Sequence, residues 1–430
     1  MPDAHSEDPA AVADEQRAAT AAVPGGAVSG DSSGVGSAAF DEATRVSANA
    51  VDSLPTGALA EKLARAGEEG RSLRVKLGID PTAPDIHLGH TVVLRKLREL
   101  QDAGHLVVLI IGDYTARVGD PSGRSTLRPI LTEAEIEANA ATFQEQALKI
   151  LDPSPERLEV RRNGEWLDMP ITDLLTLVRT TTVAQLLERD DFAKRWSASQ
   201  PISMLELMYP LLQGYDSVAV RADVELGGTD QKFNLLLGRD LQRAYGQPEQ
   251  AILTMPILVG TDGRQKMSKS LGNHIGVTDP PGEIYGKTLS IPDEAMGEYY
   301  SLLLGRELDA SLPPREAKRE LARELVAWLH SPEAAGEAER EFDRVFVERG
   351  APERIEEFAF EAQNGVVHVP GVVADAFGVS RSEARRLIDQ GAVSLDDTPL
   401  SAAEHDLPVS RLDGTVLRAG KRRFRRLRVG

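Results

Sequence analysis

The stretch "LRVKLGIDPTAPDIHLGHTVVLRKLRELQDAGHLVVLIIG", residues 73–112, holds one complete β–α–β pattern. The run from Leu73 to Ile79 is apolar and β-branched, which is typical of a strand. Apolar residues then recur at helical spacing as far as Gly104, and "LVVLIIG" restores the pattern of a buried strand. Because a crossover of this kind joins parallel strands, the stretch predicts a parallel sheet covered by helices.

The same alternation continues to about residue 280. Helical patterns are expected over residues 132–151, where Thr132 and Glu135 can form a capping box, and in "LLTLVRTTTVAQLLERDDFAKRW" and "MLELMYPLLQGY". Strand patterns return in "DVEL" and "AILTMPILVG". We therefore predict an α/β fold with a Rossmann-like, doubly wound parallel sheet over residues 53–282.

Three further segments differ in composition from this α/β segment. Residues 1–52 are rich in Ala, Gly, Ser and acids, with few large apolar side chains, so we predict a disordered acidic extension. Residues 283–360 are charged and helix-forming and predict a small helical domain. Residues 366–430 place short strand-like pieces around one helix, "SRSEARRLIDQG", and predict an α+β domain.

Composition indicates an ordinary globular enzyme. The 430 residues are 41% hydrophobic and 27% charged, and none is cysteine, which excludes disulfides, iron–sulfur clusters and thiolate zinc sites. The apolar run "LVVLII" is too short to span a bilayer, so a cytoplasmic location is expected. The net charge is −18, yet residues 411–430 hold eight bases and one acid, which favours a local nucleic-acid contact at that end.

Two short motifs point to a nucleotide site. In "HLGH", His87 and His90 are three apart where the first strand gives way to its helix, and Gly89 leaves room for a ligand against the backbone. In "KMSKS", Lys266 and Lys269 stand in a Gly-rich loop after a late strand, a pattern suited to a polyphosphate. Either motif alone is also compatible with solvated loop side chains. Their occurrence at the strand ends of one sheet favours a site that holds ATP.

The paired motifs resemble the two signatures of class I aminoacyl-tRNA synthetases. Five further stretches resemble the bacterial tyrosyl-tRNA synthetases in particular: "GIDPTAPDIHLGH", "GDYTARVGDPSGR", "YPLLQGYDS", "DVELGGTDQKFN" and the lysine loop. The resemblance covers about residues 53–430. It implies that tyrosine and ATP form tyrosyl-adenylate and pyrophosphate, and that the tyrosyl group then passes to the terminal ribose of tRNA(Tyr). It further implies Mg²⁺ bound with ATP rather than at a dedicated protein site, and a homodimer formed through the apolar helices after Ile171.

Site roles follow from this resemblance, position by position. Asp216 is expected to accept a hydrogen bond from the substrate phenol, and Tyr209 and Gln213, spaced for one helix face, to hold its ammonium group. The other tyrosine-binding positions are Asp80, Asp120 and Gln231, with Thr115 nearby. The ATP-binding positions are Gly78, Gly89, Gly228, Asp230, Met267 and Lys269. The catalytic positions are Thr82, His87, His90, Lys266 and Lys269, and the pyrophosphate loop contributes Arg124 and Arg128.

One position departs from the best-described form of the family. That form has a tyrosine, which helps to bind the substrate phenol, four residues before the position of Asp80, and this chain has Lys76 there. A bacterial subgroup also carries lysine at this position. The second contact to the phenol is therefore open, whereas the tyrosine assignment stands.

The C-terminal segment resembles S4-like RNA-binding modules. Arg381, Arg385 and Arg386 crowd the start of one helix, and Lys421 and Arg422 begin the basic tail "KRRFRRLR", so these five are expected to bind tRNA. Phe424 within that tail offers one ring for stacking on a base.

Two other functions remain open on the sequence alone, a tryptophan-activating relative and an RNA-binding protein that has lost catalysis. The absence of "GxGxxG" after the first strand argues against a dinucleotide oxidoreductase.

Overall fold

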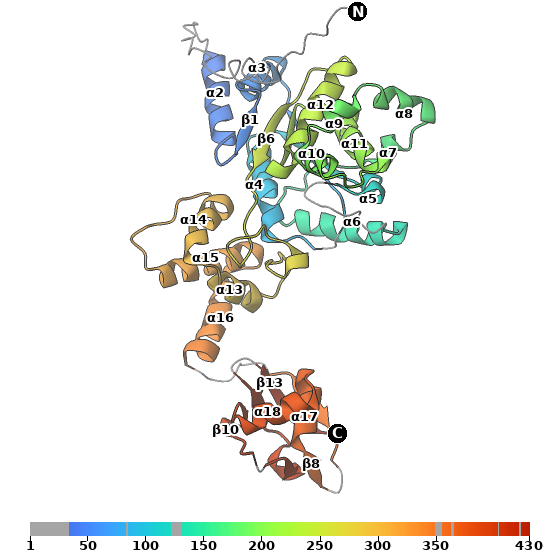
Figure 1. Ribbon diagram of the computed structural model, residues 1–430. Coiled ribbons are helices and arrows are strands. Elements are labelled where there is room, and N and C mark those ends of the chain that lie inside the picture. Colours follow the sequence, from blue (N-terminus) through green and yellow to red (C-terminus); the bar gives the residue numbers. More distant parts are fainter. Residues whose placement is uncertain are drawn as a thin grey trace, which may run out of the picture.

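The computed structural model describes residues 34–82, 85–121, 131–348, 355–362, 365–402, 404–420 and 423–430. The predicted Arg124, Arg128, Lys421 and Arg422 lie outside these ranges. Figure 1 shows an α/β part, a group of helices beside it and a C-terminal unit.

The α/β part is built on a six-stranded sheet with the order β1-β6-β5-β2-β3-β4. Its strands are β1 (Asp52–Leu54), β2 (Arg74–Ile79), β3 (Leu106–Ile111), β4 (Leu158–Arg162), β5 (Val224–Gly228) and β6 (Ala251–Met255). All pairings from β2 to β6 are parallel, and β1 joins β6 as an antiparallel edge strand. The predicted doubly wound parallel sheet is therefore confirmed. The chain runs outward from β2 to β4 and then returns to β5 on the other side of β2, which creates the crevice where such sheets bind ligands.

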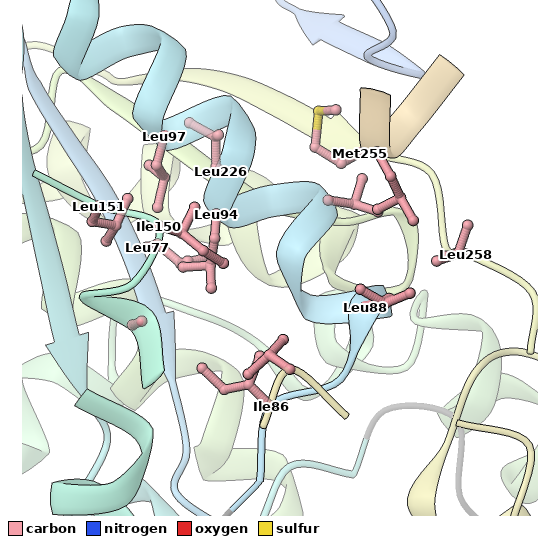
Figure 2. Close-up of a cluster of buried hydrophobic side chains, with 14 of the residues drawn as sticks. Leu77, Ile86, Leu88, Leu94, Leu97, Ile150, Leu151, Leu226, Met255 and Leu258 are labelled. Carbon is pink, nitrogen blue, oxygen red and sulfur yellow. The ribbon is translucent and has the colours of Figure 1, made fainter. Parts of the chain in front are cut away.

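Helices cover both faces of this sheet. Successive side chains of a strand point to opposite faces, and the strands here are apolar on both, so each face must be covered. Leu77 and Leu109 belong to the large core that includes α4 (Leu88–Asp102), and Figure 2 shows Leu94 and Leu97 of this helix beside Leu77. On the other face Val108 packs with residues at the end of α11 (Met204–Val220). The other helices of this part are α3 (Ala58–Glu69), α5 (Thr115–Val118), α6 (Glu133–Ala147), α7 (Gly164–Leu167), α8 (Ile171–Val178), α9 (Val183–Leu186), α10 (Asp190–Ser197) and α12 (Lys232–Ala244).

Local sequence signals explain where two helices begin. The side chain of Thr132 accepts a hydrogen bond from the backbone N–H of Glu135, so the predicted capping box at the start of α6 is confirmed. Ser203 and Glu206 form the same motif at the start of α11. This cap fixes the first turn of the helix that carries three of the predicted tyrosine-binding residues.

The prediction that residues 1–52 are disordered is wrong for residues 34–52. α2 (Gly34–Val46) forms, and Ala39, Ala43 and Val46 are buried in the main core, while β1 begins at Asp52. Small side chains at helical spacing are enough for α2 because α3 and α4 already offer an apolar surface. The lack of large apolar residues was therefore a misleading signal.

The predicted helical domain also needs correction. It contains α13 (Pro281–Leu289), α14 (Met296–Tyr299), α15 (Pro314–Leu329) and α16 (Pro332–Phe342). Buried residues such as Tyr285 and Leu325 belong to the same core as the sheet, so these helices have no separate core. Residues 357–360, placed in this domain by the sequence, form strand β7 and pair in parallel with β13 of the C-terminal unit. A strand of four residues that pairs with the far end of the chain leaves no local signal.

The C-terminal unit has its own apolar core, formed by residues such as Val373, Ile388 and Leu427. Its five-stranded sheet has the order β10-β9-β12-β13-β7, and β8 pairs with β11. Its elements are β7 (Glu357–Phe360), β8 (Val366–His368), α17 (Val369–Phe377), α18 (Arg381–Asp389), β9 (Val393–Leu395), β10 (Thr398–Pro399), β11 (Asp406–Pro408), β12 (Val416–Ala419) and β13 (Arg423–Val429). The predicted α+β character of this segment is present.

In the part of the chain that the structure describes, no helix combines the length and the apolar character needed to cross a membrane.

Leu94 tests the core between α4 and the sheet. Its side chain is fully buried, so Leu94→Ala should lower the free energy of unfolding by about 2–5 kcal/mol, through lost burial and a cavity. The same change at Leu271, which is 51% exposed, should cost less than about 0.5 kcal/mol. Chemical denaturation of both variants measures the difference, and equal losses would contradict this packing.

Candidate active site

A cavity of about 340 Å³ lies at the carboxyl ends of β2 and β5, where the strand order reverses. With one exception, the predicted tyrosine-binding, ATP-binding and catalytic residues lie in its wall. These are Gly78, Asp80, Thr82, His87, Gly89, His90, Thr115, Asp120, Tyr209, Gln213, Asp216, Gly228, Asp230, Gln231, Lys266 and Met267. The exception is Lys269.

Asp80 organises one wall of the cavity. Its carboxylate accepts hydrogen bonds from the Tyr209 hydroxyl at 2.8 Å and from Thr115 Oγ1 at 2.6 Å. A Cβ on Gly112 would overlap both the Asp80 carboxylate and the Thr115 hydroxyl, so this contact requires glycine. The strand end, α5 and α11 are thereby joined through one carboxylate. Gly112 ends the quoted "LVVLIIG", but the sequence alone does not show what it makes room for.

Asp216 lies fully buried at one end of the cavity. Its carboxylate accepts hydrogen bonds from Trp166 Nε1 at 2.8 Å and from Asn163 Nδ2 at 3.4 Å. Burial raises the pKa of this carboxyl from 3.8 to about 7, although Lys76 and the two donors oppose the rise. Sequence reasoning missed Asn163 and Trp166. The place of Asn163 directly after β4, at the same edge of the sheet, was the only signal for either.

Amide side chains connect the remaining polar wall. Gln231 Nε2 donates to Asp120 Oδ2 at 3.0 Å, and Asn234 Nδ2 donates to the side-chain oxygens of Gln213 at 2.8 Å and Gln231 at 2.9 Å. Because the nitrogen of Asn234 holds both glutamine oxygens, the amide of Gln213 and that of Gln231 have fixed orientations. Asn234 was not predicted, but it belongs to the quoted stretch "DVELGGTDQKFN".

The two histidines are stacked and uncharged. Their ring centroids are 3.9 Å apart, and the backbone N–H of His87 donates to His90 Nδ1, so the proton of His90 is on Nε2. Burial lowers the pKa of His87 to about 2, with help from His90 and His274, and burial lowers that of His90 to about 4. Near neutral pH these rings can therefore donate N–H groups to a ligand without carrying charge.

The lysine loop closes the cavity on the other side. The backbone N–H of Met267 bonds the carbonyl of Leu258, and the buried Met267 side chain faces Gly89, where a Cβ would lie 3.5 Å from it. Lys266 lines the cavity with its ammonium 3.9 Å from the Asp230 carboxylate. Burial raises the pKa of Asp230 and Lys266 opposes the rise.

Lys269 is the predicted site residue that the structure does not place in the cavity. It forms an ion pair with Asp85, two residues before His87. Both side chains are partly exposed, so this pair is weak and can be exchanged for another partner. The sequence could not show this partner because the two residues are distant along the chain.

The predicted RNA-binding residues lie on the C-terminal unit, with its separate core. Arg381, Arg385 and Arg386 are exposed on α18, whose first turn is capped by the Ser380 hydroxyl. Phe424 does not fit its expected role in base stacking, since it is only 6% exposed and packs beneath the guanidinium of Arg418.

Comparison with known proteins identifies the family of this chain. A family model described as tRNA synthetases class I (W and Y) matches residues 68–347. The fold and the cavity thus belong to an enzyme class that activates an amino acid with ATP, and the chain is a member of the class I tRNA synthetase family of the tryptophan and tyrosine enzymes.

Individual relatives narrow the family further. The chain is 53% identical to a tyrosine–tRNA ligase of Moorella thermoacetica, over 87% of this chain and 92% of that protein. It is 48% identical to a tyrosine–tRNA ligase of Thermotoga maritima, over 89% of this chain and 96% of that one. A crystal structure of tyrosyl-tRNA synthetase from Archaeoglobus fulgidus, complexed with L-tyrosine, superposes with a TM-score of 0.56 at 25% identity and covers 70% of this chain and 99% of its own. The predicted resemblance of this chain to the tyrosyl-tRNA synthetases is therefore confirmed.

The titration of Asp216 tests the electrostatics of the cavity. Its carboxyl should titrate with a midpoint near pH 7, whereas the partly exposed Glu404 should titrate near pH 2, because Ser401 and Arg411 donate hydrogen bonds to it. Between pH 3.8 and about 7 the folded chain holds a proton that the unfolded chain has lost, so this group lowers stability as the pH rises. Carbon-13 NMR of labelled carboxyls, assigned with Asp216→Asn, measures both midpoints. A midpoint below pH 5 for Asp216 would contradict its burial.

Proposed function

We propose that this cavity joins L-tyrosine to ATP and that the chain then transfers the tyrosyl group to tRNA(Tyr). In the first step a carboxylate oxygen of tyrosine bonds to the α-phosphorus of ATP, and the bond from that phosphorus to pyrophosphate breaks. In the second step the terminal ribose hydroxyl of the tRNA takes the tyrosyl group and AMP leaves. One observation carries the proposal: a single cavity holds a buried carboxylate at one end and two uncharged, stacked histidines near its lysine loop.

The tyrosine end is the wall formed by α11. Asp216 accepts a hydrogen bond from the phenol when it is ionised, and a ligand without a hydroxyl leaves this buried acceptor unpaired. Strong discrimination against phenylalanine on this ground is already known for tyrosine enzymes of this family. Tyr209 and Gln213 lie along the same helix face and hold the substrate ammonium group together with Asp120. Asp80, which accepts from the Tyr209 hydroxyl, orients the substrate, and Gln231 meets the substrate carboxylate, which is directed toward the nucleotide.

The ATP end lies between "HLGH" and the lysine loop. His87 and His90 donate N–H groups to the phosphates, and Lys266 offsets charge as pyrophosphate leaves. Gly89 and Gly228 allow close approach of the nucleotide, while Asp230 accepts from its ribose hydroxyls. The remaining predicted contacts here are Gly78, Thr82 and Met267. No general base is needed, because the attacking carboxylate is already ionised.

Lys269 reaches the phosphates only after it leaves Asp85. We assign it to the pyrophosphate as it forms, together with Arg124 and Arg128 of the loop outside the described residues. Mg²⁺ accompanies the ATP phosphates in this proposal. A cytoplasmic location remains a prediction from the sequence.

The tRNA is proposed to contact the basic surface of the C-terminal unit. Arg381, Arg385 and Arg386 stand exposed on α18, and Lys421 and Arg422, which directly precede β13, lie outside the described residues. Phosphate contacts of this kind weaken steeply with salt.

The two alternative functions differ in what they need from the cavity. A tryptophan-activating enzyme has no phenol to place against Asp216. An RNA-binding protein without catalysis has no use for a cavity whose wall combines Lys266 with the paired histidines. We therefore favour tyrosine activation over both.

Lys266 tests the catalytic proposal. Lys266→Ala should lower the rate of tyrosine-dependent ATP–pyrophosphate exchange by about 10²–10³-fold, because charge on the departing pyrophosphate loses its partner. The dissociation constant of tyrosine should change less than about twofold. Lys318→Ala, which removes a lysine paired with Asp293 outside the cavity, is the control. Normal exchange by a folded Lys266→Ala variant would refute the assigned role.

A homodimer is proposed from an exposed apolar surface on α8 and its neighbours. Its members include Ile171, Leu175, Val183, Trp196 and Met204, and each of these five is more than half exposed. A single chain rarely leaves so many large apolar side chains exposed on a few consecutive helices, here α8 to α11.

Charge on this surface should separate the two copies. Ile171→Asp combined with Leu175→Asp is expected to give a monomer in analytical ultracentrifugation, where the unchanged chain sediments as a dimer. Phe40→Asp, at an equally exposed site on α2, should leave the dimer intact. A double variant that sediments like the unchanged chain would reject this surface.

A further inference from the structure

Lys76, the residue that departs from the family pattern, is a fully buried charge. It lies in the middle of β2 and is 0% exposed. Its register partner on the neighbouring strand β5 is Glu225, and its ammonium is 2.7 Å from Glu225 Oε1. Lys76 is not among the residues that line the cavity, and its ammonium is engaged by Glu225.

The ammonium of Lys76 makes two further contacts, both on α11. It donates to the backbone carbonyl of Gln213 at 3.0 Å and to Ser217 Oγ at 2.8 Å. Ser217 Oγ in turn donates to Glu225 Oε2 at 3.0 Å, and Gln250 Nε2 donates to the same oxygen. All three donor positions of the ammonium are therefore used.

These contacts fall on the turn of α11 that lines the cavity. Gln213 is itself a predicted ammonium ligand, and Ser217 directly follows Asp216. A buried ion pair seldom adds stability compared with an apolar pair of similar size, because removing both charges from water is costly. A packed pair of apolar residues at these positions could join β2 to α11, but it could not hold a carbonyl and a hydroxyl at fixed positions.

We propose that Lys76 is a positioning residue for tyrosine recognition, which fixes the turn of α11 that presents Gln213 and Asp216 to the substrate. The inference rests on the proposed function of the cavity. In the best-described form of the family, a tyrosine at this position contacts the substrate phenol directly. Here the lysine supports recognition of the phenol indirectly, by holding the helix that carries Asp216.

The charge of Lys76 has a second consequence for Asp216. Two charged side chains face this carboxylate from the sheet, Lys76 on β2 and Glu225 on β5, while neutral donors reach it from Trp166 and Asn163. The other carboxylate nearby in the cavity wall, Asp80, already accepts hydrogen bonds from the hydroxyls of Tyr209 and Thr115. Lys76 lowers the pKa of Asp216 and Glu225 raises it, with Lys76 the stronger of the two. Loss of both charges should therefore move the pKa of Asp216 upward.

The test uses the full-length protein and a double variant, Lys76→Met with Glu225→Gln, which removes both charges of this ion pair together. The dissociation constants of tyrosine and of ATP are measured by equilibrium dialysis between pH 6 and 9. For the double variant we expect the dissociation constant of tyrosine at pH 7.5 to rise about tenfold or more. As the pH is lowered, tyrosine binding should be half lost at a higher pH than in the unchanged chain. The ATP constant should stay within about twofold.

A matched control removes another buried ion pair, which joins α10 to the first turn of α11. Arg195→Met with Glu206→Gln deletes an ion pair of 2.6 Å at the first turn of α11, far along the helix from Asp216. This control should lose stability without a change in the pH at which tyrosine binding is half lost. If the Lys76 double variant does not fold, Lys76→Gln with Glu225→Gln, which keeps one amide donor for Ser217, takes its place.

The outcomes separate the inference from the function on which it rests. If a folded variant binds tyrosine with the same constant and the same pH dependence as the unchanged chain, Lys76 has no positioning role. If the unchanged chain itself supports no tyrosine-dependent pyrophosphate exchange, the proposed function fails whatever the variants do.

Discussion

The parallel pairing of β2 with β5 brings the two halves of the α/β part together. Val75 lies opposite Val224 and Lys76 opposite Glu225, although long stretches of chain separate the partners. Because the order of strands reverses here, both strands end at the crevice between the helices that follow them. β2 leads to Asp80 and "HLGH", and β5 leads to Gly228, Asp230 and Gln231. A loss of this register would separate the amino-acid end of the cavity from the nucleotide end.

Burial, more than charge, sets the chemistry of the cavity. It keeps His87 and His90 uncharged, and it raises the pKa of Asp216 to about 7. Neutral donors bind phosphate without first forming ion pairs with the nearby carboxylates. Burial of the Asp216 carboxylate costs free energy. Hydrogen bonds from Trp166 and Asn163 offset part of this cost, and so does the charge of Lys76 behind the cavity wall. In the proposed function, this cavity takes a ligand hydroxyl at the Asp216 end and phosphates at the histidine end.

The sequence predicted the parts of this arrangement that leave local marks. The β–α–β period, the capping box at Thr132 and the two motifs with glycine are short-range patterns, and so is the spacing of Tyr209, Gln213 and Asp216 on one helix. The parts that were missed depend on contacts between distant segments. Asn163 and Trp166 reach Asp216 from after β4, Lys269 meets Asp85, and β7 pairs with the last strand. The α2 helix was missed for another reason, since alanine contributes little to a hydrophobic pattern but packs well against an existing surface.

Selection of tyrosine by a buried carboxylate is the central claim, and the relative specificity of the unchanged protein tests it most directly. Pyrophosphate exchange should be measured with tyrosine, phenylalanine and tryptophan as the amino acid, and kcat/KM compared at a pH above 7, where Asp216 is ionised. We predict that kcat/KM for tyrosine exceeds that for phenylalanine by about 10⁴–10⁵-fold, and that kcat/KM for tryptophan is as low as that for phenylalanine. This range is already known for this enzyme family and for sites built to bond a substrate hydroxyl. Comparable values for tyrosine and phenylalanine, or a preference for tryptophan, would contradict this account.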